Sequence, residues 1–222
     1  MTPIAHIETC FPTKFGIPRQ AGIVDTPGRI VFEPEYRVAE AVRGLEGFDY
    51  VWLIWQFSEA VRNDWSPTVR PPRLGGNERM GVFATRSPFR PNHLGLSSVK
   101  LLHVEQDAQL GPVLYISGAD LMDGTPIYDI KPYLPYTDSH PEARSGFATQ
   151  PAERLMEVKC PQKLLLQLPV ELRQSLLDVL AHDPRPQYQH DPDRIYGMAF
   201  NNYEVRFSAN DTQIIVVDIL QV

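Results

Sequence analysis

The chain has 222 residues, of which 43% are hydrophobic, and a formal net charge of −6. This composition provides enough apolar residues for a folded core, which excludes an intrinsically disordered chain. The two cysteines, Cys10 and Cys160, lie far apart and outside any CxxC or Cys/His pattern. We therefore expect reduced thiols, a cytoplasmic location and no metal site. No window approaches about eighteen apolar residues, and no basic region precedes an apolar run at the N-terminus, so we expect neither a membrane span nor a signal peptide.

Short strands separated by loops are predicted over the first 50 residues. Residues 4–9 alternate partly in polarity and predict a strand, and residues 28–32 predict another. The segment between them contains Pro12, Gly16, Pro18 and Gly22. These residues exclude a long regular element, so we expect a loop there. Residues 35–45 predict one or two helical turns.

The most strongly apolar run is YVWLIWQF, residues 50–57. It is too short for a typical helix and rich in aromatic and branched residues, so it predicts a buried central strand. Ser58 and Glu59 follow it, at the point where a buried strand would surface and meet a ligand. Residues 63–76 are rich in proline and glycine and predict a loop. Residues 81–84 predict a short strand.

Residues 85–97, TRSPFRPNHLGLS, predict a shaped loop. They fit neither the helical nor the strand period, and their two prolines each remove a backbone donor. Arg86 and Arg90 flank Phe89, so the loop offers forked hydrogen-bond donors beside an aromatic face. Such a loop suits an anionic, planar ligand. The alternative is an ordinary arginine-rich surface loop.

The charge of the chain is unevenly distributed. Residues 61–100 carry seven basic side chains against two acidic ones, a surplus of five positive charges, so the rest of the chain carries −11. A basic segment on an acidic body can bind a polyanion locally while the remainder repels non-specific contacts. The alternative is that scatter along the chain produced this segment by chance.

A hairpin and a second irregular loop follow. Residues 96–104 and 112–117 predict paired strands around a turn at 107–111. Residues 123–138, DGTPIYDIKPYLPYTD, begin with a turn signal and contain three prolines, which predicts a loop. Its interspersed apolar residues lead us to expect that this loop packs along the rest of the domain or along a partner subunit.

The C-terminal part predicts a small α+β domain after a linker at residues 139–150. Pro169 precedes leucines at helical spacing in residues 170–181, which predicts a helix with a buried stripe. Strands are predicted at residues 155–158, 195–200, 203–207 and 213–220. We therefore expect a mainly β protein with an α+β appendage: an N-terminal β-barrel over residues 1–140 and a small α+β domain over residues 150–222.

Common catalytic motifs are missing from the sequence. It contains no GxGxxG after a strand, no GxxxxGK[ST] phosphate loop, no HExxH helix and no GxSxG elbow. Its six histidines show no ligand spacing. Ser–His–Asp catalysis is not excluded by sequence, but nothing favours it.

The chain resembles the TsaA/TrmO family of tRNA methyltransferases, which depend on S-adenosylmethionine. The resemblance covers residues 1–140 in four ordered blocks, namely FPTKFGIPRQ, YVWLIWQF, TRSPFRPNHLGLS and DGTPIYDIKPYLPYTDS. The later stretch RPQYQHDPDRIYGMAFNNYEVRF resembles the appendage of the bacterial members. Four blocks in the right order are far more specific than any single short motif.

The resemblance implies a β-barrel that forms a homodimer, with the methyl donor bound near the subunit contact. It implies a reaction in which a methyl group is added to the exocyclic nitrogen of threonylcarbamoyl-adenosine, next to the anticodon of a tRNA. The donor-contacting positions implied by motif matching are Pro18, Arg19, Gln20, Ser58, Glu59, Arg86, Leu96, Asp123, Gly124, Thr125 and Pro126. Some relatives carry a basic pair where this chain has Ser58 and Glu59, which leaves two alternatives for that contact, one through the side chains and one through the main chain alone.

The acceptor nitrogen belongs to a urea-like group and is a poor nucleophile, so a nearby base would assist the transfer. Candidate bases are Asp129 and Asp138. Arg90 and Lys131 are candidates for binding the threonyl carboxylate. Candidate residues for stacking on or hydrogen-bonding the base are Tyr128, Tyr133 and Tyr136; at least one of these tyrosines is expected only to pack against the barrel.

Two other functions use the same loops. One is a non-catalytic module that binds S-adenosylmethionine or RNA, and the other is a methyltransferase that acts on a different base or a small molecule. Mass spectrometry of tRNA nucleosides with and without the gene separates all three.

Overall fold

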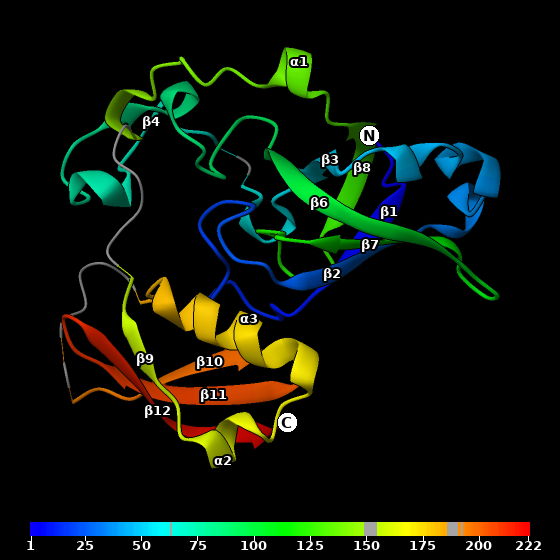
Figure 1. The fold of residues 1–222 in the computed structure, drawn as a ribbon. Helices are drawn as coiled ribbons and strands as arrows, with labels where there is room; N and C mark the ends of the chain where they lie inside the picture. Colours follow the sequence, from blue (N-terminus) through cyan, green and yellow to red (C-terminus); the bar gives the residue numbers. More distant parts are fainter. Residues whose placement is uncertain (63, 149–154, 186–190, 192) are drawn as a thin grey trace.

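The computed structural model describes residues 1–62, 64–148, 155–185, 191 and 193–222. The chain forms a β-barrel and a four-stranded sheet with its own helices, one above the other in Figure 1. Each part has its own hydrophobic core. The expected mainly β architecture with an N-terminal barrel and a smaller α+β part is confirmed.

The barrel closes in the order β1-β2-β7-β6-β3-β8. All neighbouring strands are antiparallel. The strands are β1 (Ala5–Thr9), β2 (Pro27–Phe32), β3 (Tyr50–Gln56), β6 (Leu94–Asp107), β7 (Gly111–Ser117) and β8 (Pro126–Pro132). The predicted hairpin corresponds to β6 and β7 and is confirmed. Closure leaves no open strand edge in the barrel, and loops carry the chain from one strand to the next.

Strand β3 lies at the centre of the block YVWLIWQF, but it is buried on one face only. Val51, Leu53 and Trp55 point into the barrel core, whereas Trp52 and Ile54 lie on the outer face and are only partly covered. The predicted strand is confirmed, and its burial is limited to the inner face. A barrel strand has an inner and an outer face, and its outer apolar residues need another cover.

The expectation of an irregular loop throughout residues 123–138 was also wrong. Strand β8 runs through this segment and joins β3 to β1. Its prolines occupy the two ends of the strand, where ladder hydrogen bonds are dispensable. A register shift pairs Ile54 with Asp129 but Trp55 with Ile127, so the polarity does not alternate regularly. Ile127 is fully buried in the barrel core, which confirms that this segment packs along the barrel.

A small lobe projects from the barrel between β3 and β6. It contains the two-stranded ribbon β4 (Thr68–Val69) and β5 (Met80–Gly81). The strand expected at residues 81–84 ends at Gly81, and a 3-10 turn follows. The 3-10 turns of the chain are η1 (Pro34–Tyr36), η2 (Ala39–Val42), η3 (Leu45–Gly47), η4 (Ser58–Ala60), η5 (Pro72–Leu74), η6 (Val82–Ala84) and η7 (Gly146–Ala148).

The C-terminal part is a sheet in the order β10-β11-β12-β9, with α3 across one face. Its elements are β9 (Glu157–Lys159), α2 (Gln162–Leu165), α3 (Val170–Ala181), β10 (Tyr196–Phe200), β11 (Tyr203–Ala209) and β12 (Gln213–Gln221). The predicted helix is confirmed, with Leu172, Leu176 and Leu180 buried. The short helix α1 (Pro135–Asp138) follows β8. The end of the predicted linker and part of the last sequence block, residues 149–154, 186–190 and 192, lie outside the described residues.

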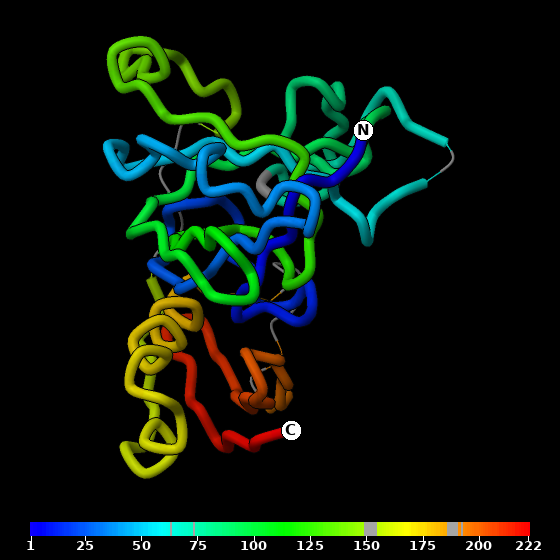
Figure 2. The backbone as a smooth tube through the Cα atoms, turned by 90° about the vertical axis from the view of Figure 1, so that its right-hand side faces the viewer, coloured from blue at the N-terminus to red at the C-terminus, as the bar shows by residue number. Residues whose placement is uncertain are grey.

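Among the described residues, no helix is long and apolar enough to cross a membrane. The tube in Figure 2 shows the same division seen from the side, with the barrel above the C-terminal sheet and its helices.

Candidate functional site

The segment between β1 and β2 lies between the barrel and the C-terminal part. Phe11 packs edge-on against Phe200 at 6.0 Å, and Phe15 stacks on Phe207 at 6.4 Å. The backbone amide of Asn201 donates to the carbonyl of Cys10 at 2.7 Å. The C-terminal core thus holds this segment, although the segment belongs in sequence to the barrel.

Gly16 lies against Met198 of the C-terminal part. Its φ is +101°, and a Cβ atom built on it would lie 2.5 Å from the sulfur of Met198. Both the backbone conformation and the available space therefore require glycine there. Pro18, Arg19 and Gln20 follow directly and line a large cleft.

The second wall of the cleft is the loop predicted at residues 85–97. Arg90 is turned inward, and its guanidinium donates to the carbonyls of Val82 at 3.3 Å and Thr85 at 2.7 Å. His93 adopts a left-handed conformation with φ of +51° and accepts a hydrogen bond on Nε2 from the amide of Arg62 at 3.2 Å. These contacts fix the shape of the loop. Residues 85–93 are irregular as predicted, whereas β6 begins at Leu94.

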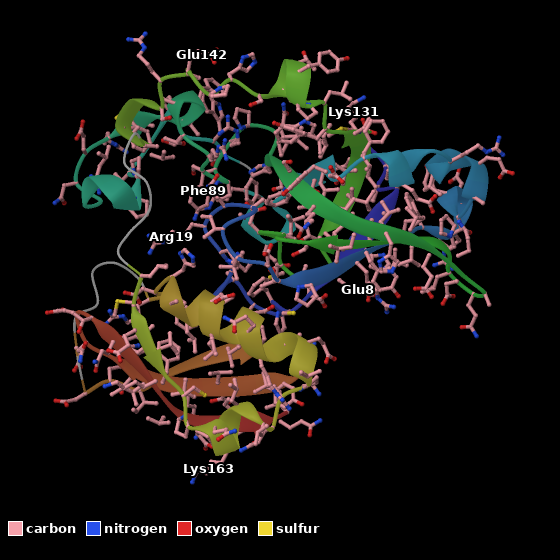
Figure 3. All side chains as sticks on the ribbon, viewed as in Figure 1. Glu8, Arg19, Phe89, Lys131, Glu142 and Lys163 are labelled. Atoms are coloured by element: carbon pink, nitrogen blue, oxygen red, sulfur yellow. The ribbon has the colours of Figure 1, made fainter. Side chains whose placement is uncertain are left out.

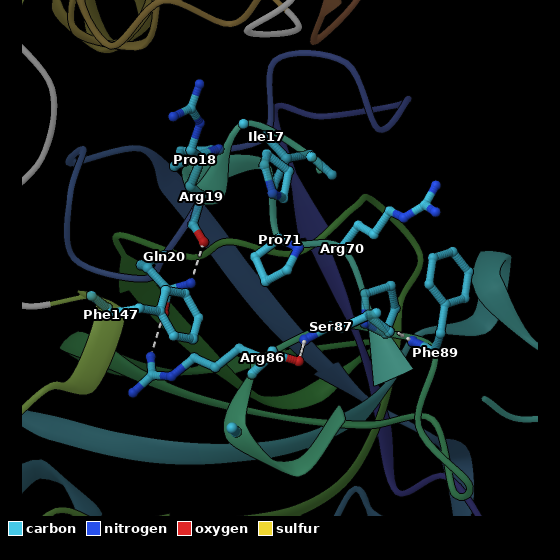
Figure 4. Close-up of a pocket in the computed structure, with 18 of the residues that line it drawn as sticks. Ile17, Pro18, Arg19, Gln20, Arg70, Pro71, Arg86, Ser87, Phe89 and Phe147 are labelled. Atoms are coloured by element: carbon cyan, nitrogen blue, oxygen red, sulfur yellow. Dashed lines mark hydrogen bonds between the residues drawn. The ribbon is translucent and has the colours of Figure 1, made fainter. Parts of the chain in front are cut away.

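Arg86 joins the two walls. Its guanidinium is exposed and donates to the side-chain oxygen of Gln20, as the dashed line in Figure 4 shows. Among the described residues, no carboxylate lies within ion-pair distance of Arg86. Its guanidinium is therefore hydrogen-bonded to a neutral amide, and its positive charge stays available to an anion. The sequence placed Arg86 and Gln20 in separate blocks, and the fold brings them together.

A chain of polar groups runs from the barrel core to this junction. The indole of Trp55 donates to Ser97 at 3.0 Å, and the Ser97 hydroxyl donates to Asp120 at 2.6 Å. Burial raises the pKa of the Asp120 carboxyl, whereas hydrogen bonds from Ser97 and the backbone of Ala21 and the positive charge of Arg86 lower it. Asp120 was not among the residues predicted from sequence, because an acidic residue shortly after a strand belongs to no motif.

The cleft has a volume of about 2300 Å³ and lies between the barrel, the small lobe and the end of α3. Such a volume exceeds the roughly 300–1,000 Å³ of an ordinary small-molecule site. Seven arginines and two aspartates line it. One of the aspartates, Asp183, is already paired with Arg185 at 2.8 Å. The lining is therefore strongly basic, although the chain as a whole is acidic, and it has room for more than one small ligand.

Several donor-site candidates from the sequence lie outside this cleft. The carbonyl of Glu59 accepts a hydrogen bond from Lys14 at 2.5 Å, which ties the Ser58–Glu59 turn to the segment between β1 and β2. Leu96 points outward from β6 and is 59% exposed. The turn made by Asp123, Gly124, Thr125 and Pro126 is bonded to β1.

Two hydrogen bonds to β1 hold that turn in place. The Asp123 carboxylate accepts the amide of Thr9 at 2.9 Å, and the amide of Gly124 donates to the carbonyl of Ile7 at 2.8 Å. Burial raises the pKa of the Cys10 thiol to about 12, and the negative charge of Asp123 adds to this effect. Cys10 is therefore a protonated thiol within the C-terminal core.

The candidates for acceptor chemistry also lie away from the cleft, on β8 and beyond it. Asp129 pairs with Lys131 at 3.5 Å on the exposed side of the strand. The Asp138 carboxylate accepts hydrogen bonds from the Trp52 indole at 2.8 Å and from the Leu134 amide at 2.9 Å. These bonds lower the pKa of Asp138, which weakens it as a proton acceptor.

The tyrosines of this region have partners within the chain. Tyr128 donates to the side chain of Gln56 at 2.6 Å, and Tyr133 packs on Trp52 at 5.6 Å. Tyr136 is 86% exposed. Figure 3 shows Lys131 near the top of the barrel, well away from Arg19 on the cleft. Among the described residues, no group of three or more His, Cys, Asp or Glu side chains could hold a metal ion.

Comparisons with known proteins cover most of the chain. Residues 6–139 match the model of the tRNA-methyltransferase O N-terminal domain, and residues 152–222 match that of the TrmO C-terminal domain. A tRNA (adenine(37)-N6)-methyltransferase of Escherichia coli is 41% identical over 94% of this chain and 92% of its own length. One of Eikenella corrodens is 48% identical over 72% of this chain and 90% of its own. A crystal structure of TrmO from Pseudomonas aeruginosa superposes with a TM-score of 0.80 at 34% identity, covering 100% of this chain and 98% of that one.

Proposed function

The chain belongs to the TrmO family, and we propose on that basis that it is an S-adenosylmethionine-dependent tRNA methyltransferase. Its relatives are named for methylation of N6 of the adenine at position 37, and we assign this reaction to the chain. The observation that carries the proposal is the arginine-rich cleft in which Gln20 and Arg86 meet. A basic cleft of this size accommodates a charged methyl donor together with a nucleotide of an RNA loop.

We propose that the methyl donor binds where residues 18–20 meet Arg86. The residues fit this ligand because the Arg86 guanidinium forms no ion pair with a described carboxylate, and the donor has a carboxylate to bind it. Gln20 provides an amide beside it, and the positive charge of Arg86 partly offsets the rise in the pKa of Asp120 that burial causes. The donor supplies an electrophilic methyl group on a sulfonium.

Methyl transfer from a sulfonium is an in-line displacement, so the protein contributes mainly alignment of donor and acceptor. The loop held by Arg90 and the segment held by the C-terminal core are both fixed by the contacts described above, which limits their motion. We propose that these two walls set the angle between the sulfonium and the acceptor nitrogen. Neither Asp129 nor Asp138 lines the cleft of a single chain.

We further propose a homodimer formed through the outer face of β3 and β6. This face carries Trp52 and Ile54, which are only partly covered in one chain, and the exposed Leu96. In this dimer, Leu96 contacts the donor that is bound to the partner copy. The reaction in each copy likewise receives four side chains from the other copy, namely Asp129, Lys131, Tyr128 and Tyr133. Sedimentation velocity tests this arrangement, and a monomer at working concentration would contradict it.

The acceptor that we propose is threonylcarbamoyl-adenosine, whose threonyl carboxylate requires a cation. Arg90 already donates to two loop carbonyls. If it also binds that carboxylate, the same side chain both holds the loop and binds the acceptor. A tRNA-modifying enzyme of this kind works in the cytoplasm, where its substrate is found.

The test is methyl transfer from labelled S-adenosylmethionine to tRNA by the purified protein, with calorimetry of donor binding. Arg86→Ala should weaken donor binding by about 2 kcal/mol, roughly thirtyfold in Kd, because a charged hydrogen bond is lost. Leu102→Ala, on an exposed and distant part of β6, serves as the control. Donor binding without transfer to any tRNA would instead identify a non-catalytic binding module.

A further inference from the structure

Two large aromatic side chains are exposed on the small lobe. Trp65 is 51% exposed and Phe83 is 72% exposed, and their rings stack with centroids 6.1 Å apart and an angle of 28° between their planes. Trp65 precedes β4, and Phe83 lies in the turn η6 after β5, so the two-stranded ribbon brings them together. Folding the lobe has left this pair facing solvent.

The surroundings of the pair are basic. Both rings line the cleft, together with the exposed Arg70 and Arg79. The guanidinium of Arg90 lies over the Phe83 ring at 5.9 Å. Aromatic faces interleaved with arginines are typical of proteins that bind single-stranded nucleic acid: bases stack on the rings, and guanidinium groups bind the phosphates.

We propose that Trp65 and Phe83 form a shelf on which one unpaired base of the substrate RNA loop stacks. This inference rests on the proposed function and specifies how the RNA is bound. Stacking suits an unpaired base because both of its faces are free, whereas a base within a duplex is covered by its neighbours. The flanking arginines then meet the phosphates on either side of that base.

A protein partner is the less favoured occupant of this shelf. An apolar contact between subunits would have to desolvate the neighbouring arginines, which is costly unless carboxylates pair with them. The apolar face proposed for the dimer lies on β3 and β6 of the barrel, not on the small lobe. The charge around Trp65 and Phe83 is complementary to RNA.

The experiment measures binding of a stem–loop RNA that carries the anticodon-loop sequence with an unmodified adenosine, using the full-length protein. Phe83→Ala and Trp65→Ala should each weaken this binding about tenfold, whereas Phe83→Tyr, which keeps a stacking ring, should retain it. Leu102→Ala is the matched control, because Leu102 is an exposed apolar residue away from the cleft. Affinity for S-adenosylhomocysteine should stay unchanged in all four variants.

Unchanged RNA affinity in Phe83→Ala and Trp65→Ala, with wild type binding the stem–loop normally, would overturn the shelf and leave the proposed function intact. A changed oligomeric state in these variants would also overturn it, in favour of a protein contact. A wild-type protein that neither binds the stem–loop nor methylates tRNA would overturn the proposed function and the shelf together.

Discussion

Arg86 and Arg90 are four residues apart in one loop, yet they serve different purposes. Arg90 is partly buried and holds the carbonyls of Val82 and Thr85, whereas Arg86 is exposed and reaches Gln20 across the cleft. The sequence predicts the presence of both donors but not their directions. The direction depends on where the folded loop places acceptors: the turn η6 brings the carbonyls of Val82 and Thr85 within reach of Arg90, and Gln20 comes from another segment.

The buried carboxyl of Asp120 leads to a prediction about how stability depends on pH. Burial raises its pKa in the folded protein, so the folded state binds this proton more tightly than the unfolded state. The stability of wild type should therefore fall as the pH rises from roughly 4, the ordinary aspartate value, through the raised pKa, and level off above it. Asp120→Asn cannot ionise. The thermal midpoint of wild type minus that of Asp120→Asn should therefore decrease as the pH rises over this range.

The control is Asp107→Asn, because Asp107 is an exposed aspartate whose pKa is lowered by hydrogen bonds from the Leu110 and Gln109 amides. Its contribution has the opposite sign: it is present above the ordinary aspartate pKa and is lost as the pH falls. A flat difference curve for Asp120→Asn would show that its carboxyl is not perturbed by burial.

At the scale of elements, the sequence predicted most strands of the barrel but not β8. The periodicity that identifies a strand is broken there by the register shift opposite Ile54 and Trp55, and the prolines at its ends imitate a loop. The sequence also gave no sign that Phe11 and Phe15 belong to the C-terminal core. That contact joins residues nearly 200 positions apart, and a hydrophobic residue in a proline-rich segment does not reveal its partner.

The packing of the C-terminal core against the segment between β1 and β2 leads to a second prediction. Gly16→Ala adds a Cβ atom that collides with the Met198 side chain and opposes a φ of +101°. Because Met198 is fully buried, we expect the segment to shift and to move residues 18–20. Donor affinity should fall about tenfold, which corresponds to about 1.4 kcal/mol. Isothermal titration with S-adenosylhomocysteine measures it.

Gly44→Ala is the matched control for that variant. Gly44 also has a positive φ, of +87°, but nothing lies within 4 Å of its added Cβ, and it lies between η2 and η3. It should lose stability through backbone strain while keeping wild-type donor affinity. Equal donor affinity in Gly16→Ala and wild type would mean that the C-terminal part does not position this segment.

At the scale of the whole molecule, the distribution of charge is the feature that sequence and structure share. The basic segment at residues 61–100 includes the small lobe and the loop that carries Arg86 and Arg90, and both line the cleft. The sequence could not show that Arg144 and Arg185 add to the same lining, since they come from segments beyond the barrel. The cleft is thus assembled from parts of the chain that are separate in sequence, and its basic character follows from their meeting.

The claim that the chain methylates tRNA is tested most directly by mass spectrometry of tRNA nucleosides from cells with and without the gene. We expect N6-methylated threonylcarbamoyl-adenosine to disappear without the gene and the unmethylated nucleoside to accumulate. Wild type should restore the methylated form, whereas Arg86→Ala should not. An unchanged nucleoside profile, or the loss of a different methylated nucleoside, would contradict it.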